Sequence, residues 1–178
     1  KDSENIEIFG PSTKLIMVVD DEPIFNKRLA KERLYFHHGG LDNNVIFEGE
    51  GLKLANGENT VKKEFLRSIA NSKGKVTVLM NGHGSPDTIS IASNAYNNSK
   101  DLDEKLTLIH YKELGDALIE SNNIENINLL CFSCLSYDFI TNLINYLEEK
   151  GYKKRPQTMV AASNKKAASL GRFYDRLP

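Results

Sequence analysis

Five short apolar runs alternate with segments of helical periodicity, and this alternation restricts the fold more than any other feature of the sequence. The runs cover residues 15–19, 44–47, 76–80, 127–132 and 158–162. The main segments between them (25–36, from 60 onward, 111–121 and 137–150) space apolar residues as one face of a helix does. Continuous apolar runs are typical of strands buried on both faces, and parallel strands need helical crossovers. The sequence therefore predicts an α/β domain with a mostly parallel sheet of five to six strands and helices on both faces.

Length and charge narrow the class of protein. The 178 residues fit a single domain spanning 1–178, and 23 basic against 24 acidic residues give a net charge of −1. This balance predicts no nucleic-acid partner and no general attraction to an anionic membrane. No apolar run approaches the roughly 20 residues of a membrane-spanning helix, so no membrane partner is predicted for this chain.

The first residues and the number of cysteines allow further predictions about processing and disulfide bonds. The first residues are polar, so no signal peptide is predicted, and the absence of an initiating Met indicates a processed or excised fragment. The localisation stays unknown, because a cytoplasmic protein and a secreted effector both fit. Two cysteines cannot build a disulfide framework. Residues 94–105 are rich in Asn, Asp, Ser and Lys and predict a mobile surface loop.

Reactive residues follow the ends of the predicted strands. In open α/β sheets, sites form outside the carboxyl ends of the strands. There the sequence offers Asp20, Asp21 and Glu22 after the first strand, His83 after the third, Cys134 after the fourth, and Ser163 and Asn164 after the fifth. A histidine and a cysteine at neighbouring strand ends predict thiol catalysis, in which the imidazole manages the proton of the thiol. The amides of Gly84 and Cys134 are candidate oxyanion donors.

These two motifs resemble those of the caspase-like cysteine peptidases. Residues 76–84 read Val-Thr-Val-Leu-Met-Asn-Gly-His-Gly, residues 128–134 read Asn-Leu-Leu-Cys-Phe-Ser-Cys, and His83 precedes Cys134 by 51 positions. An apolar strand ending in His-Gly, followed by one ending in a small residue and Cys, is similar to caspases, legumain, gingipains, clostripain and self-cleaving domains of some bacterial toxins. The resemblance covers the order of elements from about residue 14 to 174.

The resemblance implies a fold, an activity and a partner. It implies a three-layer caspase-like peptidase domain and an endopeptidase that cleaves peptide bonds through a thioester acyl-enzyme, with His83 and Cys134 as the catalytic dyad. The small residue Ser133 before Cys134 selects this cysteine, while Cys131 lies inside the apolar run as inert packing. The expected partner is a protein or peptide substrate, with self-cleavage or a regulatory partner as in relatives. No cofactor and no metal are expected.

Substrate-binding residues are also implied by the resemblance. Ser163 and Asn164 belong to a segment similar to the family's substrate groove. Phe132 stands two residues before the nucleophile, where relatives place a pocket residue, and indicates an apolar subsite. Asp20 and Asp21 also fall at a pocket position, where a carboxylate favours a Lys or Arg side chain. These indications oppose each other, so no cleavage preference is predicted.

Two alternatives come from other motifs. Residues 14–23 resemble the start of a response-regulator receiver domain, a signalling module in which an acidic pair such as Asp20 and Asp21 holds Mg²⁺. The third strand, however, ends in Asn81 and not in the expected Asp. Cys131 and Cys134 form a Cys-x-x-Cys motif, but without the Trp and Pro that usually accompany a redox site. Zinc-deaminase motifs are incomplete, and His37, His38 and His110 are assigned no role in the chemistry.

Overall fold

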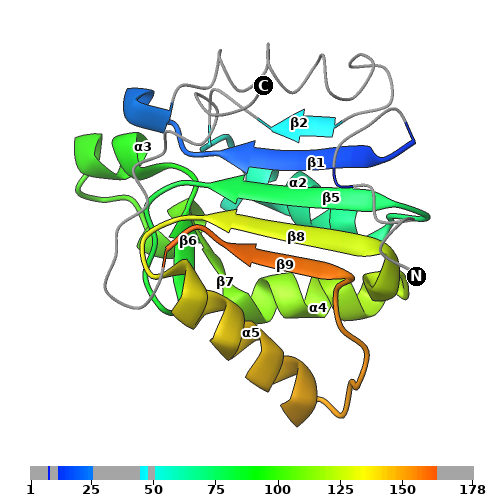
Figure 1. The fold of residues 1–178 in the computed structure, drawn as a ribbon. Helices are drawn as coiled ribbons and strands as arrows, with labels where there is room; N and C mark the ends of the chain where they lie inside the picture. The colour runs from blue at the N-terminus through cyan, green and yellow to red at the C-terminus, as the bar shows by residue number, and fades with distance from the viewer. Residues whose placement is uncertain (1–7, 9–11, 26–44, 48–50, 164–178) are drawn as a thin grey trace.

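A single parallel sheet of five strands organises the structure (Figure 1). The computed structural model describes residues 8, 12–25, 45–47 and 51–163. The strands lie in the order β2-β1-β5-β8-β9, and every neighbouring pair is parallel. Their bounds are β1 Lys14–Val19, β2 Val45–Phe47, β5 Val76–Asn81, β8 Ile127–Phe132 and β9 Thr158–Ala161. The predicted α/β class with a parallel sheet is confirmed, and the five strands are those that the apolar runs indicated.

The most apolar runs form the centre of the sheet. All residues of β5 and β8 are buried, as are all of β1 except Lys14. The edge strand β9 is only half-buried along its length. This distribution follows from burial on two faces, which a central parallel strand requires and an edge strand does not.

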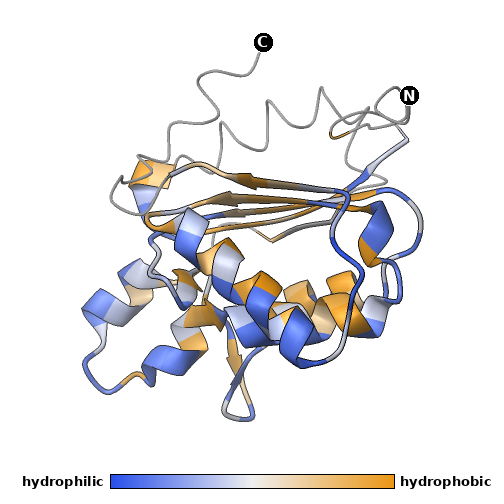
Figure 2. Cartoon of the chain, turned by 60° about the horizontal axis from the view of Figure 1, so that its bottom comes forward, coloured by the Kyte–Doolittle hydropathy of each residue, from blue (hydrophilic) through white to orange (hydrophobic). Residues whose placement is uncertain are grey.

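Three helices cover one face of the sheet (Figure 2). They are α2 Thr60–Ala70, α4 Tyr111–Ser121 and α5 Ser136–Glu149. Each turns an apolar stripe toward the strands, with buried side chains that include Phe65, Ile69, Leu118, Phe139 and Leu143. His110 is the N-cap residue of α4 and forms a capping box with Glu113 in the first turn of the helix.

The opposite face of the sheet is buried as well. A second apolar cluster there joins Leu79 and Phe132 to Phe25, which belongs to the short 3-10 helix η2 Pro23–Phe25. The predicted helix over 25–36 lies outside the described residues beyond Phe25. Burial of both faces agrees with a three-layer arrangement, and a helix on this second face stays a prediction.

A long insertion between β5 and α4 departs from the expected loop. It contains the antiparallel strands β6 Thr88–Ser90 and β7 Leu108–His110, the helix α3 Ser93–Asn98 and the 3-10 helix η3 Glu104–Thr107. Residues 94–105 lie at the surface as predicted, but they do not form a loop throughout, because α3 and the start of η3 occupy more than half of the segment. Carboxylates of the β1 end hold α3 in place, which local composition does not reveal.

The smaller elements complete the described chain. A two-stranded hairpin of β3 Leu54–Ala55 and β4 Glu58–Asn59 precedes α2, and the 3-10 helix η4 Ile124–Asn126 precedes β8. No helix in the described part of the chain has both the length and the apolar character needed to cross a membrane.

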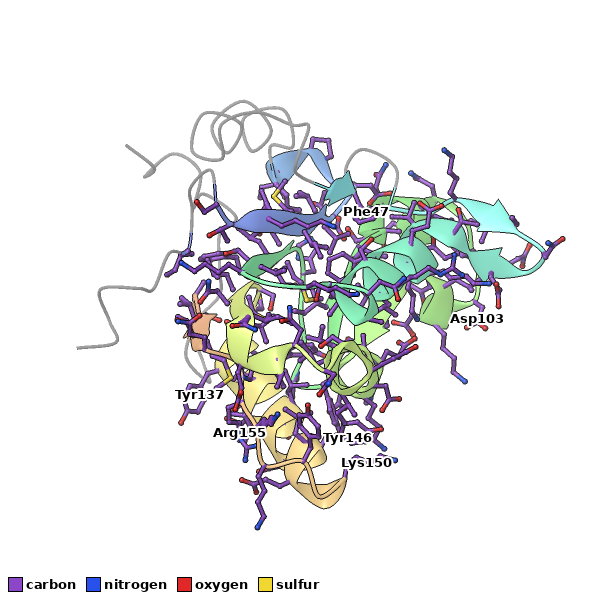
Figure 3. The ribbon with its side chains drawn as sticks, turned by 90° about the vertical axis from the view of Figure 1, so that its right-hand side faces the viewer. Phe47, Asp103, Tyr137, Tyr146, Lys150 and Arg155 are labelled. Carbon is purple, nitrogen blue, oxygen red and sulfur yellow. The ribbon has the colours of Figure 1, made fainter. Side chains whose placement is uncertain are left out.

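The packing of α4 against α5 depends on a glycine. Tyr146 of α5 lies over Gly115 of α4, and its hydroxyl donates a 2.6 Å hydrogen bond to Asp116. This hydrogen bond raises the pKa of Tyr146 to about 12. Figure 3 shows Tyr146 on α5 and Lys150 at the C-cap of that helix, and the Lys150 ammonium lies 5.4 Å from the centre of the Tyr146 ring. The Tyr146 side chain therefore connects the two helices through its ring, which packs on Gly115, and through its hydroxyl, which is bonded to Asp116.

Gly115→Ala should destabilise the protein although alanine is the better helix former. A Cβ atom at this position would lie 2.7 Å from Cδ2 of the Tyr146 ring. We expect the free energy of unfolding to fall by up to about 2 kcal/mol, measured by urea denaturation, because overpacking costs about 1–3 kcal/mol and the helix propensity of alanine offsets only about 1 kcal/mol of this cost. In a Tyr146→Leu background the same substitution should cost little, and an equal cost in both backgrounds would contradict the explanation.

Candidate active site

The carboxyl ends of three strands meet at one edge of the sheet. In Figure 1 the arrowheads of β1, β5 and β8 point to the side where η2 and α3 lie. The register pairs Val19 with Asn81 and Asn81 with Phe132, so the three loops leave the sheet at the same level. Between β1 and β5 the chain reverses the direction in which it adds strands, and this is where doubly wound sheets form their ligand crevice.

The loops that carry His83 and Cys134 are in direct contact. The Gly82 amide donates a 3.2 Å hydrogen bond to the Phe132 carbonyl. A Cβ atom at Gly84 would lie 2.7 Å from both the Cys134 carbonyl oxygen and Ser133 Oγ. Since no side chain larger than hydrogen fits between them, Gly84 allows the two loops to approach this closely. The structure thus brings the predicted histidine and cysteine motifs together at one edge.

The His83 imidazole lies between a carboxylate and an aromatic ring. Its Nε2 is 2.5 Å from Glu22 Oε2, and its ring meets the Phe25 ring edge-on at a centroid distance of 5.0 Å. Half of the His83 side chain is exposed to solvent, at 50%. Ser93 of α3 donates to the same Glu22 oxygen at 3.2 Å. The imidazole is therefore oriented by residues of the β1 end and remains accessible.

Cys134 occupies a strained turn between β8 and α5. Its neighbours Ser133 and Ser136 are buried, whereas Cys134 itself is partly exposed. Leu135, which follows it, has a φ of 55° in the left-handed region. A side chain larger than glycine in this region costs of order 1–3 kcal/mol, and such strain is concentrated at functional sites. The turn places the cysteine at the start of a helix and outside the buried strand.

Ser163 holds the Cys134 turn from the neighbouring strand end. Its buried hydroxyl donates to the Ser133 carbonyl at 2.7 Å, and its amide donates to Ser136 Oγ at 3.1 Å. The Tyr137 amide donates to the Ser163 carbonyl at 3.2 Å. The structure thus places Ser163 beside the cysteine, with its hydrogen-bonding groups directed to the protein. A role in substrate binding stays a prediction, and Asn164 lies outside the described residues.

The acidic pair Asp20 and Asp21 is engaged with α3. Asp20 is fully buried, and its carboxylate accepts hydrogen bonds from the Ser90 hydroxyl at 2.8 Å and the Ser93 amide at 3.1 Å. Asp21 accepts from the amides of residues 94 and 95 at 2.8 and 3.0 Å. Their predicted contacts with a basic substrate side chain or with Mg²⁺ stay predictions. Among the described residues, no group of three or more His, Cys, Asp or Glu side chains could hold a metal ion.

Phe132 and Cys131 both belong to the core. Phe132 is 6% exposed and packs with Phe25 and Leu130 on the face opposite the helices, so the apolar subsite stays a prediction. Cys131 faces the helices and has no exposed surface. Burial raises the pKa of the Cys131 thiol to about 12, which favours the neutral thiol over the reactive thiolate.

The sequence did not reveal the contacts of Glu22 or the burial of two polar groups at this edge. The sequence places Glu22 in an acidic run, but it does not predict that Glu22 contacts His83, because 61 positions separate the two residues in the chain. The Asn81 side-chain amide and Ser133 Oγ are buried, and no described residue forms a hydrogen bond with them. Unsatisfied buried groups are rare in folded proteins and call for a specific explanation. No local sequence signal identifies them, because their burial depends on the loops that pack above them.

Comparison with known proteins finds no match. No protein-family model, no curated protein and no solved structure matches this chain. The support for a function therefore comes from the geometry of this edge and from the two sequence motifs.

The two cysteines should differ in their reaction with iodoacetamide at pH 8. We expect Cys134 to be alkylated in the folded protein, because it is partly exposed, and Cys131 to react only after unfolding in urea, because it is buried as a neutral thiol. Peptide mass mapping before and after denaturation distinguishes the two sites. Equal alkylation of both cysteines in the folded state would contradict this interpretation.

Proposed function

We propose that this protein is a cysteine endopeptidase of the caspase-like type, with Cys134 as the nucleophile and His83 as general acid and base. The observation that carries the proposal is the direct contact of Gly84 with Ser133 and Cys134, at the edge where parallel sheets bind ligands. The strained turn at Leu135 and the accessible imidazole support it. Its substrate is a protein or peptide, and the resemblance to self-cleaving domains adds self-cleavage or a regulatory partner to the proposal.

The reaction proceeds in two covalent steps. The Cys134 sulfur attacks the carbonyl carbon of a peptide bond, and the tetrahedral intermediate expels the amine as the C–N bond breaks. His83 takes up the thiol proton and delivers it to the leaving amine, which leaves a thioester on Cys134. Water then attacks the thioester and passes a proton to His83. The C–S bond breaks, the carboxylic acid leaves, and the thiol regains its proton.

Two backbone amides are available to stabilise the oxyanion. Neither the Gly84 amide nor the Cys134 amide donates a hydrogen bond to any described residue. Donors that are oriented by the fold and free of partners can stabilise the charge that develops on the carbonyl oxygen. The close packing of Gly84 on Ser133 and Cys134 supports a shared role for the two amides.

Glu22 acts as the positioning residue for His83. When the imidazole is neutral, the contact with the carboxylate keeps the ring proton on Nε2, so that Nδ1 is the nitrogen that exchanges protons with the thiol and the substrate. The carboxylate also stabilises the imidazolium that forms during the reaction. The Asp20 carboxylate holds the backbone of Glu22, because Asp20 Oδ1 accepts a hydrogen bond from the Glu22 amide. The same oxygen accepts from Ser93 Oγ, which connects this turn to α3.

Cys134→Ala and His83→Ala should each abolish peptide hydrolysis. The assay uses a mixed fluorogenic peptide library together with a peptidyl acyloxymethyl ketone that alkylates catalytic cysteines. We expect the ketone to label Cys134 of the wild-type protein much faster than it labels glutathione, because the site binds its peptide part. The His83→Ala protein should lose this rate advantage, since the thiolate loses its proton acceptor.

Cys131→Ala is the matched control, because it also removes a thiol but leaves the proposed site intact. It should retain labelling and hydrolysis if it folds, as judged by circular dichroism. Labelling of Cys134 at the rate of glutathione, or hydrolysis that persists in Cys134→Ala, would exclude the peptidase. A mass increase of one phosphoryl group after treatment with acetyl phosphate and Mg²⁺ would favour the receiver alternative.

Glu22→Gln should lower kcat by about ten- to a hundredfold with little change in KM. The amide keeps the size of the side chain but loses the charge that stabilises the imidazolium. The tautomer of His83, read from the ¹⁵N chemical shifts of its ring, should shift from Nε2–H toward a mixture. Glu104→Gln, at an exposed carboxylate of η3, should change neither measurement. An unchanged tautomer in Glu22→Gln would argue against the positioning role even if activity fell.

A further inference from the structure

A cavity of about 370 Å³ lies beside the first turn of α4, and neither His83 nor Cys134 lines it. Its walls come from α2, from the antiparallel strands β6 and β7, from η3 and from the start of α4. Asp103, which is labelled in Figure 3, helps to locate the cavity, because it is the N-cap residue of η3, one of the elements that line the cavity. Five elements thus contribute to one cavity.

Three lysines line this cavity, although the whole chain is nearly neutral. They are Lys62, Lys105 and Lys112, against a single carboxylate, that of Glu113. Glu113 is already engaged, since its Oε2 is 2.8 Å from the Lys62 ammonium and its Oε1 accepts from the His110 amide at 3.0 Å. The ammonium groups of Lys105 and Lys112 are exposed and form no ion pair with the described residues. The cavity therefore keeps a positive charge that the described residues do not neutralise.

His110 adds a neutral donor to the same wall. Its Nδ1 accepts a 3.1 Å hydrogen bond from the Lys112 amide, so the proton of the neutral ring is on Nε2. No described residue accepts a hydrogen bond from this Nε2. The capping box that begins α4 thus fixes the tautomer of a histidine in the cavity, and the cavity combines cationic and neutral donors with the apolar side chain of Leu108.

We propose that this cavity binds a small anion with phosphate or carboxylate groups, which Lys105 and Lys112 engage by charge and His110 engages through its Nε2–H. Lys62 also lines the cavity, where Glu113 and the Lys105 carbonyl, at 3.0 Å, hold its ammonium. The site is separate from the proposed peptidase site, so the test needs no enzymatic activity. An anion of two or more charges fits best, because it can engage both exposed lysines at once.

The experiment is isothermal titration calorimetry of the full chain with inorganic tripolyphosphate and, separately, with citrate, which distinguishes phosphate from carboxylate. We expect saturable binding at one site with a Kd of about 1 mM or tighter for at least one probe. Lys105→Ala/Lys112→Ala should weaken binding about tenfold or more, as loss of charge-assisted hydrogen bonds predicts. The control Lys153→Ala/Lys154→Ala removes the same charge from exposed lysines that do not line the cavity and should leave Kd unchanged.

His110→Asn tests the neutral donor without removing the helix cap, because the Asn side-chain oxygen can still accept from the Lys112 amide. It should weaken binding several-fold while the melting temperature of the free protein stays the same. Amide chemical shifts in a labelled sample should change at Thr88, His110 and Lys112. Absence of saturable binding for both probes, or equal weakening by the two double-lysine variants, would overturn the proposal.

Discussion

The close packing of Gly84 on Ser133 and Cys134 is the contact on which the proposed site depends. It is possible because β5 and β8 are neighbours in register, so their loops emerge at the same level. The two strands are fully buried and therefore rigid, which makes the position of the loops a property of the core. Any larger residue at Gly84 would have to separate the histidine and cysteine motifs.

The acidic residues at the end of β1 contact two different parts of the structure. Asp20 and Asp21 accept hydrogen bonds from the start of α3, and Glu22 reaches His83. The run therefore connects the insertion after β5 to the imidazole through the Ser93 hydroxyl, which lies 2.5 Å from Asp20 Oδ1 and 3.2 Å from Glu22 Oε2 and shares its one proton between them. A buried carboxylate such as Asp20 is costly unless its oxygens are satisfied, and the insertion supplies the donors. This coupling explains why the polar segment after β6 is ordered as a helix.

The same insertion contributes to the second, positively charged hollow. Its antiparallel strands β6 and β7 form one wall of the cavity, and Thr88 of β6 is also tied to Ser85 of the histidine loop, through its amide at 3.0 Å. The insertion is thus the element that both the proposed active site and the proposed anion site use. The anion site could not be located from composition, because the net charge of −1 conceals the local excess of lysine.

The sequence by itself determined the class of fold, the five strands of the sheet and the edge at which reactive residues gather, because burial on both faces imposes continuous apolar runs and parallel strands align their carboxyl ends. It also distinguished Cys134 from the core residue Cys131. Only the tertiary structure decided that Glu22 meets His83, that Ser163 supports the cysteine turn and that residues 94–105 contain helices. These features depend on contacts between residues far apart in the chain, and neither local propensity nor periodicity encodes such contacts.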